Sequence, residues 1–164
     1  MNLVLIGLPG AGKTTVGKAV AERLQLPFFD CDEAVEEVTG KSIPAIFAEK
    51  GEAWFRRQET ACLRELLKRD RCVIAAGGGV ILAEENRKML NAAGTVFLDR
   101  TVNDIMSTFE AERRPLMATH TLQETSDARR HLYLKTADFI VAESTVNAAI
   151  ESIVNWWRKY SCAF

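Results

Sequence analysis

The pattern most specific for a chemical role lies close to the start of the chain. Residues 7–14 read Gly-Leu-Pro-Gly-Ala-Gly-Lys-Thr and match G-x-x-x-x-G-K-[ST]. In this pattern the glycines let the backbone wrap around a polyphosphate, and successive N–H groups at a helix N-terminus supply positive potential. Lys13 would reach the outer phosphates and Thr14 would ligate Mg²⁺. We therefore predict that a nucleoside triphosphate is bound with Mg²⁺ by Gly10, Ala11, Gly12, Lys13, Thr14 and Thr15.

Two carboxylates, Asp30 and Asp32, follow the apolar pair Phe28–Phe29. Residues two apart on an extended strand point the same way, and open α/β sheets bind ligands at the carboxyl ends of their strands. One carboxylate could hold metal-bound water, and the other could orient or deprotonate an acceptor hydroxyl. The alternative is that Asp32 caps a helix beginning near Glu33, and the pair alone does not decide between the two.

An arginine with two flanking carboxylates follows at helical spacing. Arg56 is four residues after Glu52 and three before Glu59, so both acids could hold its guanidinium in one pose. A fixed guanidinium suits a carboxylate ligand. An ordinary solvated network of ion pairs would explain the same spacing.

Glycines and further arginines offer more contacts to an anion. Gly77–Gly79 come directly after an apolar run, where their N–H groups could approach a ligand without intervening side chains. A tight turn is the alternative. Arg129 and Arg130 begin a helical segment that we expect to end near Tyr133, and they provide a second source of positive charge for an anionic acceptor.

The elements that must position these residues alternate along the chain. Short apolar runs are separated by longer amphipathic stretches, which indicates a parallel α/β architecture. The most regular helical pattern covers Lys13–Leu24, directly after the glycine-rich loop. We expect strands at Leu3–Ile6, Phe28–Asp30, Val73–Ala76, Val96–Asp99 and Phe139–Ala142.

The stretch from Glu110 to about Ser126 has a different character. It is polar, contains Arg113, Arg114 and Pro115, and has no sustained apolar period. We predict a long surface loop at about residues 110–126, which in a compact domain typically acts as a lid. A disordered segment is the alternative.

Composition and charge limit the class of protein. With 164 residues, 48% hydrophobic and 26% charged, we expect one globular domain over residues 1–164. A formal net charge of −1 argues against general affinity for nucleic acid or an anionic membrane. The 4 cysteines include no C-x-x-C pair, so neither a zinc site nor a disulfide framework is expected. The first apolar run is too short for a signal peptide or a membrane span, and we expect a cytoplasmic protein.

Taken together, these segments resemble the shikimate kinases, a family in the nucleoside-monophosphate-kinase group of P-loop folds. The resemblance is carried in order by the P-loop, Asp30-Cys-Asp32, residues 40–47, Gly51-Glu52 with Phe55-Arg56, Gly77–Gly79 and Arg114-Pro-Leu. It implies a five-stranded parallel sheet of order 2-3-1-4-5, flanked by helices and carrying a lid. It also implies transfer of the γ-phosphate of ATP to the 3-hydroxyl of shikimate, in aromatic amino-acid biosynthesis, by a monomer.

The resemblance further implies roles for residues on the acceptor side. Asp32 would hold the acceptor hydroxyls and act as the base, and Arg56 and Arg129 would clamp the shikimate carboxylate. Gly78 and Gly79 would complete the substrate pocket.

On the phosphate side, the resemblance implies that Asp30 lies in the Mg²⁺ shell with Thr14, through water. Lys13 and the lid residue Arg114 would neutralise the transferring phosphoryl group. Arg114 would also contact ATP, and Glu59 would support Arg56.

The sequence departs from the family pattern after the lid and before it. His131 stands where the family usually has a proline, which leaves the choice of clamp between Arg129 and Arg130, although spacing favours Arg129. Residues 105–108 lack the arginine that usually stacks on adenine. The alternatives are a kinase for gluconate or a nucleoside monophosphate, or a P-loop binding protein without activity.

Overall fold

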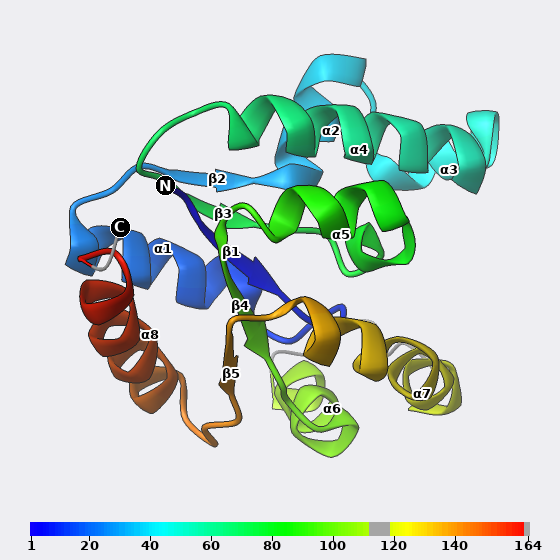
Figure 1. Ribbon diagram of the computed structural model, residues 1–164. Coiled ribbons are helices and arrows are strands. Elements are labelled where there is room, and N and C mark those ends of the chain that lie inside the picture. Colours follow the sequence, from blue (N-terminus) through cyan, green and yellow to red (C-terminus); the bar gives the residue numbers. More distant parts are fainter. Residues whose placement is uncertain (112–118, 163–164) are drawn as a thin grey trace.

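The computed structural model describes residues 1–111 and 119–162, and its centre is a sheet of five parallel strands (Figure 1). The order β2-β3-β1-β4-β5 confirms the expected fold class. Predicted and observed strand ends differ by at most two residues. The strands are β1 (Leu3–Ile6), β2 (Phe28–Asp30), β3 (Val73–Ala75), β4 (Gly94–Leu98) and β5 (Phe139–Val141).

The central strands are buried on both faces. Every residue of β1, β3 and β4 is buried, and Leu3 pairs with Val73 on one side and Gly94 on the other. Strands covered on both faces read as continuous apolar runs, which is why these runs were visible in the sequence.

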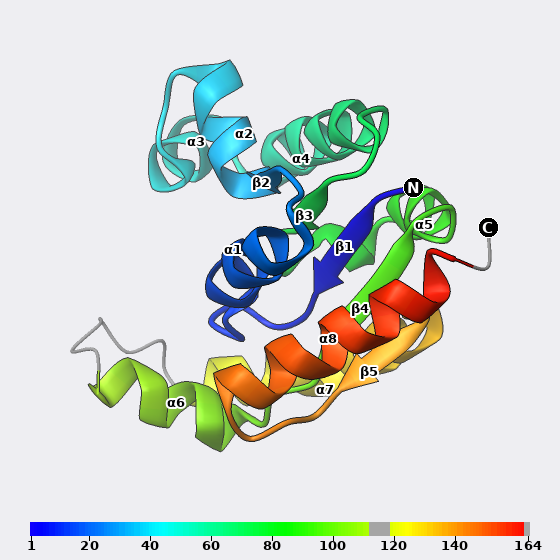
Figure 2. The same cartoon turned by 90° about the vertical axis from the view of Figure 1, so that its left-hand side faces the viewer.

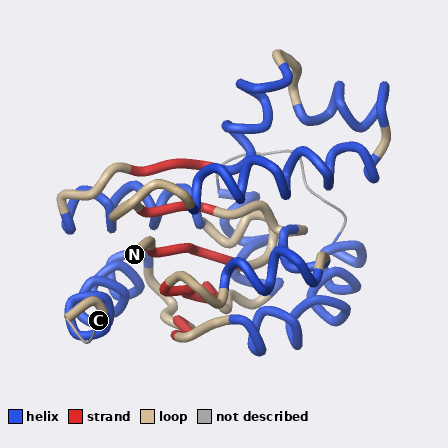
Figure 3. Tube along the Cα trace, turned by 45° about the horizontal axis from the view of Figure 1, so that its top comes forward, coloured by secondary structure: helices blue, strands red, loops and turns tan. Residues whose placement is uncertain are grey.

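Helices form the outer layers of the molecule (Figures 2 and 3). Helices α1 and α8 pack together on one face of the sheet, and α5 and α7 lie on the other, while α2, α3 and α4 gather beyond the β2 edge. The helices are α1 (Lys13–Leu24), α2 (Cys31–Thr39), α3 (Ile43–Lys50), α4 (Glu52–Leu67), α5 (Glu84–Leu90), α6 (Val102–Ala111), α7 (Thr119–Thr136) and α8 (Val146–Tyr160), with a short 3₁₀ helix η1 (Val80–Leu82).

The start of α2 decides between the two interpretations of the acidic pair. Asp30 is the N-cap residue, and its Oδ1 accepts a hydrogen bond of 2.9 Å from the backbone N–H of Asp32. The alternative that Asp32 caps this helix is therefore wrong. Because the cap is Asp30, the Asp32 carboxylate is free to face the carboxyl edge of the sheet.

Helix α7 is longer than the sequence predicts. It begins at Thr119 instead of Arg129 and continues to Thr136, so the predicted loop of residues 110–126 is helical at both ends. Among the α7 residues whose burial is described, Leu122 and Tyr133 are fully buried, and they lie three turns apart on one face. With its anchors so widely spaced, this helix shows too little apolar period to be recognised.

Residues 112–118 of the predicted lid, including Arg114, lie outside the described residues. Within the part of the chain that is described, no helix has the length and apolar character needed to cross a membrane.

Candidate active site

The glycine-rich loop between β1 and α1 forms one wall of a cavity of about 680 Å³ at the carboxyl edge of the sheet. Gly10 and Gly12 adopt left-handed φ angles of +78° and +88°, which glycine reaches without steric cost. The Lys13 ammonium donates to the carbonyls of Gly7 and Leu8 at 3.0 and 2.8 Å, so it lies across the loop. This arrangement places a cation and backbone N–H groups together, as a polyphosphate site requires.

Burial lowers the pKa of Lys13 to about 8, although the nearby carboxylates of Asp32 and Asp30 favour the charged form. A bound polyphosphate would add several negative charges beside this amine. The Lys13 ammonium is therefore expected to be most strongly held as a cation when the ligand is present.

Thr14 and Asp30 form an oxygen pair at the edge of the cavity. The Thr14 hydroxyl donates to Asp30 Oδ2 at 2.7 Å, while Oδ1 of the same carboxylate holds the start of α2. Hydroxyl, carboxylate and phosphate oxygens are the donors that Mg²⁺ prefers. This pair therefore fits the predicted magnesium role.

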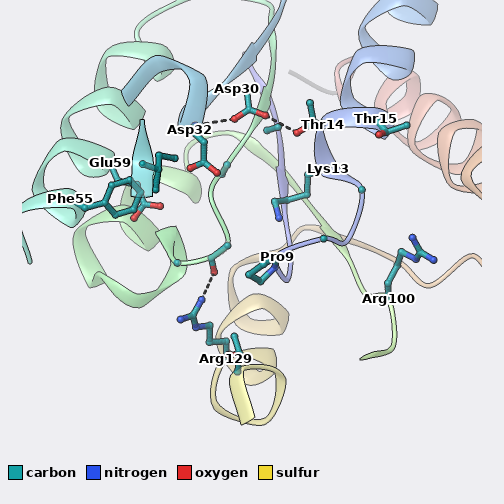
Figure 4. Close-up of a pocket in the computed structure, with 18 of the residues that line it drawn as sticks. Pro9, Lys13, Thr14, Thr15, Asp30, Asp32, Phe55, Glu59, Arg100 and Arg129 are labelled. Atoms are coloured by element: carbon teal, nitrogen blue, oxygen red, sulfur yellow. Dashed lines mark hydrogen bonds between the residues drawn. The ribbon is translucent and has the colours of Figure 1, made fainter. Parts of the chain in front are cut away.

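Asp32 faces the same cavity from the first turn of α2 (Figure 4). Burial and the neighbouring Asp30 carboxylate raise its pKa, while Lys13 and Arg56 act in the opposite direction. A raised pKa makes a carboxylate a better proton acceptor, provided that it is ionised at the working pH. The backbone just after β3 passes close to this carboxylate, because a Cβ on Gly77 would lie 2.9 Å from Asp32 Oδ1. A larger residue at position 77 would therefore displace the Asp32 side chain.

Arg56 is held from two sides on α4. Its Nη1 donates to Glu59 Oε2 at 2.8 Å and its Nη2 donates to Glu52 Oε1 at 3.1 Å. Burial works against the charge of Arg56, but the bonds to Glu59 and Glu52 outweigh it and raise the Arg56 pKa. Glu59 is only 1% exposed, whereas Glu52 is 59% exposed, so the interpretation as an ordinary solvated network holds for the Glu52 pair and is wrong for the Glu59 pair.

The glycine run after β3 lies between the P-loop and Arg56. A Cβ on Gly78 would be 2.8 Å from Pro9 Cδ, and one on Gly79 would be 2.1 Å from Arg56 Nη1. Larger residues would displace either the P-loop or the guanidinium. Both glycines line the cavity, as predicted for a run that lets backbone approach a ligand.

The two arginines on α7 have different surroundings. Arg129 lines the cavity, and its Nη1 donates to the carbonyl of Gly78 at 3.1 Å (Figure 4). Arg130 instead forms an ion pair of 2.6 Å with Asp99. The structure thus brings Arg129 to the predicted site with Asp32 and Arg56 and leaves Arg130 outside the cavity lining.

Several polar side chains at or near the cavity were missed as functional candidates, and Tyr133 and Arg100 are two of them. The Tyr133 hydroxyl donates to Gly78 O at 2.5 Å, and Arg100 lines the cavity after β4. The signal for Tyr133 was its place among apolar residues, because a buried tyrosine needs a hydrogen-bond partner. For Arg100 the signal was its position at the carboxyl end of a predicted strand.

Comparison with known proteins agrees with the resemblance seen in the motifs. The family model described as shikimate kinase matches residues 9–158. A shikimate kinase of Burkholderia pseudomallei is 42% identical over 161 residues, covering 94% of this chain and 86% of the relative. That of Methylococcus capsulatus is 39% identical, covering 96% of this chain and 93% of the relative.

Solved structures give the same result. A shikimate kinase from Acinetobacter baumannii, in complex with shikimate, superposes with a TM-score of 0.88 at 34% identity, covering 97% of this chain and 93% of that one. A shikimate kinase from Aquifex aeolicus superposes with a TM-score of 0.83 at 32% identity, covering 98% of each chain. The matching family model, the sequence identities and the superpositions together show that this chain belongs to the shikimate kinase family.

Proposed function

We propose that this protein is an ATP-dependent shikimate kinase, which transfers the γ-phosphate of ATP to the 3-hydroxyl of shikimate and yields shikimate 3-phosphate and ADP. The reaction would serve aromatic amino-acid biosynthesis. One observation carries the proposal: Asp32, Arg56 and Arg129 line the same cavity as the P-loop lysine Lys13. The cavity thus combines a polyphosphate site with a carboxylate base and two cations for an anionic acceptor.

The residues on the acceptor side of the cavity fit a ligand that carries one carboxylate and several hydroxyl groups. Arg56 and Arg129 come from different helices, and we assign both to the carboxylate of shikimate, with backbone of Gly78 and Gly79 completing the pocket. Two fixed guanidiniums orient a planar anion better than one, because each forms directional hydrogen bonds. Asp32 then binds the acceptor hydroxyls at the side of the cavity nearest Lys13.

In the transfer step, the 3-hydroxyl oxygen attacks the γ-phosphorus of ATP and the bond from that phosphorus to the β,γ-bridging oxygen breaks. The hydroxyl proton passes to the Asp32 carboxylate, and ADP leaves with the bridging oxygen. Lys13 and backbone N–H groups of residues 10–15 neutralise charge on the phosphates. This division of work suits phosphoryl transfer, which depends on positioning and charge neutralisation.

Magnesium belongs to the same proposal. Thr14 would hold Mg²⁺ directly and Asp30 would hold it through water, because their oxygens lie together at the edge of the cavity. When bound, Mg²⁺ supplies charge neutralisation for the phosphate oxygens. Arg114, which lies outside the described residues, is proposed to add a further cation to the transferring group.

We further propose that the enzyme works as a monomer in the cytoplasm. Lys13, Asp32, Arg56 and Arg129 of a single chain line one cavity, which supports a site that one chain can form. Light scattering coupled to gel filtration tests the monomer, and a mass of about twice 18.3 kDa would contradict it.

The acceptor assignment is tested by incubating the purified protein with MgATP and shikimate, gluconate, AMP or no acceptor, and measuring ADP. We expect ADP formation to depend on shikimate and to stay near the background rate with the other three. Equal ADP release with and without shikimate would contradict the proposal. Stimulation by gluconate or AMP instead would identify one of the alternative kinases.

A further inference from the structure

The glycine run after β3 has all three of its carbonyls bonded to donors of the protein. The carbonyl of Gly77 accepts from the N–H of Val80 at 3.1 Å. That of Gly79 accepts from the N–H of Leu82 at 3.0 Å. The carbonyl of Gly78 accepts from two side chains of α7. These carbonyls therefore point at protein donors, and the helix η1 supplies two of those donors.

The N–H groups of Gly78 and Gly79 are the polar atoms of the run that are left for a ligand. Within the described residues neither N–H has a hydrogen-bond acceptor, and both glycines line the cavity. The run also lies against Arg56, because a Cβ on Gly79 would be 2.1 Å from Arg56 Nη1. Neighbouring backbone N–H donors beside a guanidinium suit a carboxylate. Their position depends on what holds the run in place.

Side chains of α5 hold the other end of η1. A helix of three residues cannot bond its own last carbonyls, so these need donors from elsewhere. Asn86 Nδ2 donates to the carbonyl of Val80 at 2.9 Å. Arg87 Nη1 donates to the carbonyls of Ile81 and Leu82 at 2.8 and 2.9 Å. A continuous series of hydrogen bonds thus runs from α5 through η1 to the glycine run.

The burial of Asn86 indicates that this residue does more than stabilise the fold. Asn86 is 2% exposed, and among the described residues its Oδ1 is buried without a hydrogen-bond partner. A buried amide oxygen that loses its hydration without gaining a partner destabilises the folded state, and an apolar side chain of similar size avoids this cost. The bond from Asn86 to Val80 is therefore better explained by the placement of η1.

We propose that Asn86 and Arg87 are positioning residues for the acceptor pocket. From α5 they hold the carbonyls of η1, and η1 holds the glycine run so that its N–H groups reach the carboxylate of the acceptor. Neither residue is among the described residues that line the cavity, so both act through the backbone. The inference rests on the proposed function, because it takes shikimate as the acceptor.

Variants that remove these donors but keep side-chain bulk test the proposal. Asn86→Leu and Arg87→Met remove the donors, and Arg87→Lys keeps one. Lys88→Met is the matched control, because Lys88 is exposed on the same helix and pairs with Glu84 at 2.7 Å. Titration calorimetry measures the affinities for shikimate and Mg²⁺-ADP, steady-state rates give the KM for shikimate, and denaturant melts give the unfolding free energy.

We expect Asn86→Leu and Arg87→Met each to weaken shikimate binding at least about fivefold and to raise the KM for shikimate by a similar factor, because binding depends on exact placement of the donors. Mg²⁺-ADP affinity should stay within about twofold, since the P-loop holds the nucleotide. Asn86→Leu should do this without loss of unfolding free energy. Arg87→Lys should give an intermediate affinity, and Lys88→Met should match the wild type.

The amide resonances of the glycine run report its position without any ligand. The chain has 10 glycines, so selective ¹⁵N-glycine labelling gives a simple NMR spectrum. We expect the resonances of Gly78 and Gly79 to move in Asn86→Leu and Arg87→Met and to stay in place in Lys88→Met.

Unchanged shikimate affinity in both folded variants would overturn the inference. An equal loss of Mg²⁺-ADP affinity would also overturn it, because the two residues would then support the whole sheet edge instead of the acceptor pocket. Glycine resonances that do not move would overturn it independently of shikimate. Wild-type protein that binds no shikimate would contradict the proposed function, and the glycine resonances would still decide whether Asn86 and Arg87 position the run.

Discussion

Glu59 is 1% exposed, and within the described residues its Oε1 is buried without a hydrogen-bond partner. Its other oxygen accepts from Arg56 at 2.8 Å. A buried carboxylate loses its hydration, and an ion pair in such a place contributes little net stability. The pair is therefore better explained by the fixed pose that it gives to Arg56 than by stabilisation of the fold.

Arg56→Ala tests the carboxylate clamp, with Arg57→Ala as a matched control, because Arg57 is the exposed neighbour on the same helix. We expect Arg56→Ala to raise the KM for shikimate at least about tenfold, since a charge-assisted contact is lost. It should also destabilise the fold by about 3–5 kcal/mol, because Glu59 loses its partner. Arg57→Ala should change neither quantity. An unchanged KM for shikimate in Arg56→Ala would show that the clamp is misassigned.

Asp32→Asn tests the base. If Asp32 accepts the hydroxyl proton, kcat should fall about 100- to 10,000-fold while Mg²⁺-ADP binding changes little. Glu33→Gln, which alters the adjacent exposed carboxylate, should leave kcat near the wild-type value. Steady-state rates and titration calorimetry measure the two quantities. A kcat of Asp32→Asn within about threefold of wild type would remove Asp32 from the proton transfer.

The pH dependence follows from Lys13, whose pKa burial lowers to about 8. Below pH 8 the amine is charged and binds phosphate, and above it the free enzyme increasingly carries a neutral amine. The value of kcat/KM for ATP should therefore decline as pH rises through about 8, since this ratio reports the free enzyme. The corresponding decline in kcat should occur at a higher pH, because bound phosphate stabilises the charged form of Lys13. A kcat/KM that stays level to about pH 10 would contradict this.

At the scale of elements, α7 and the glycine run after β3 act as one unit. Tyr133 is fully buried, its ring stacks on Phe97 at a centroid distance of 5.0 Å, and its hydroxyl shares the Gly78 carbonyl with Arg129. Burial raises the pKa of Tyr133 to about 12, so the hydroxyl remains a donor throughout the physiological range. The helix therefore positions both an acceptor arginine and the backbone beside it.

Tyr133→Phe removes one hydrogen bond and keeps the ring. Because Arg129 is then the only donor to the Gly78 carbonyl among the described residues, we expect a loss of about 1–2 kcal/mol in unfolding free energy. The KM for shikimate should rise several-fold with kcat less affected, since Arg129 and the glycines shift together. Denaturant melts and acceptor titrations measure both effects, and wild-type values for Tyr133→Phe would show that the contact is dispensable.

Elements with dense local patterns could be predicted from the sequence, and those anchored by distant contacts could not. The bounds of β1, β2 and α1 match the prediction because continuous apolar runs and the P-loop mark them. Helix α7 was missed in part because two widely spaced residues anchor it. Likewise, the choice of Asp30 as the cap depends on backbone geometry that the Asp-Cys-Asp pattern does not encode.

At the scale of the whole molecule, a net charge of −1 coexists with a cationic cavity. Lys13, Arg56, Arg100 and Arg129 all line it, together with Asp30, Asp32 and Glu59. The overall composition argues only against general binding of a highly charged polymer such as nucleic acid. The parallel sheet, in contrast, brings these residues to one edge from five separate segments of the chain. The alternation of apolar runs and amphipathic stretches predicts a parallel sheet with a ligand site at its carboxyl edge. The strand order, in contrast, was predicted from the family resemblance alone.

The most direct test of the central claim is the identity of the product. Wild-type protein incubated with MgATP and shikimate is followed by ³¹P and ¹H NMR. We predict a phosphate monoester whose phosphorus couples to the proton on carbon 3, formed in equal amount to ADP. Unmodified shikimate after ADP has formed, or phosphate on a different hydroxyl, would contradict the account.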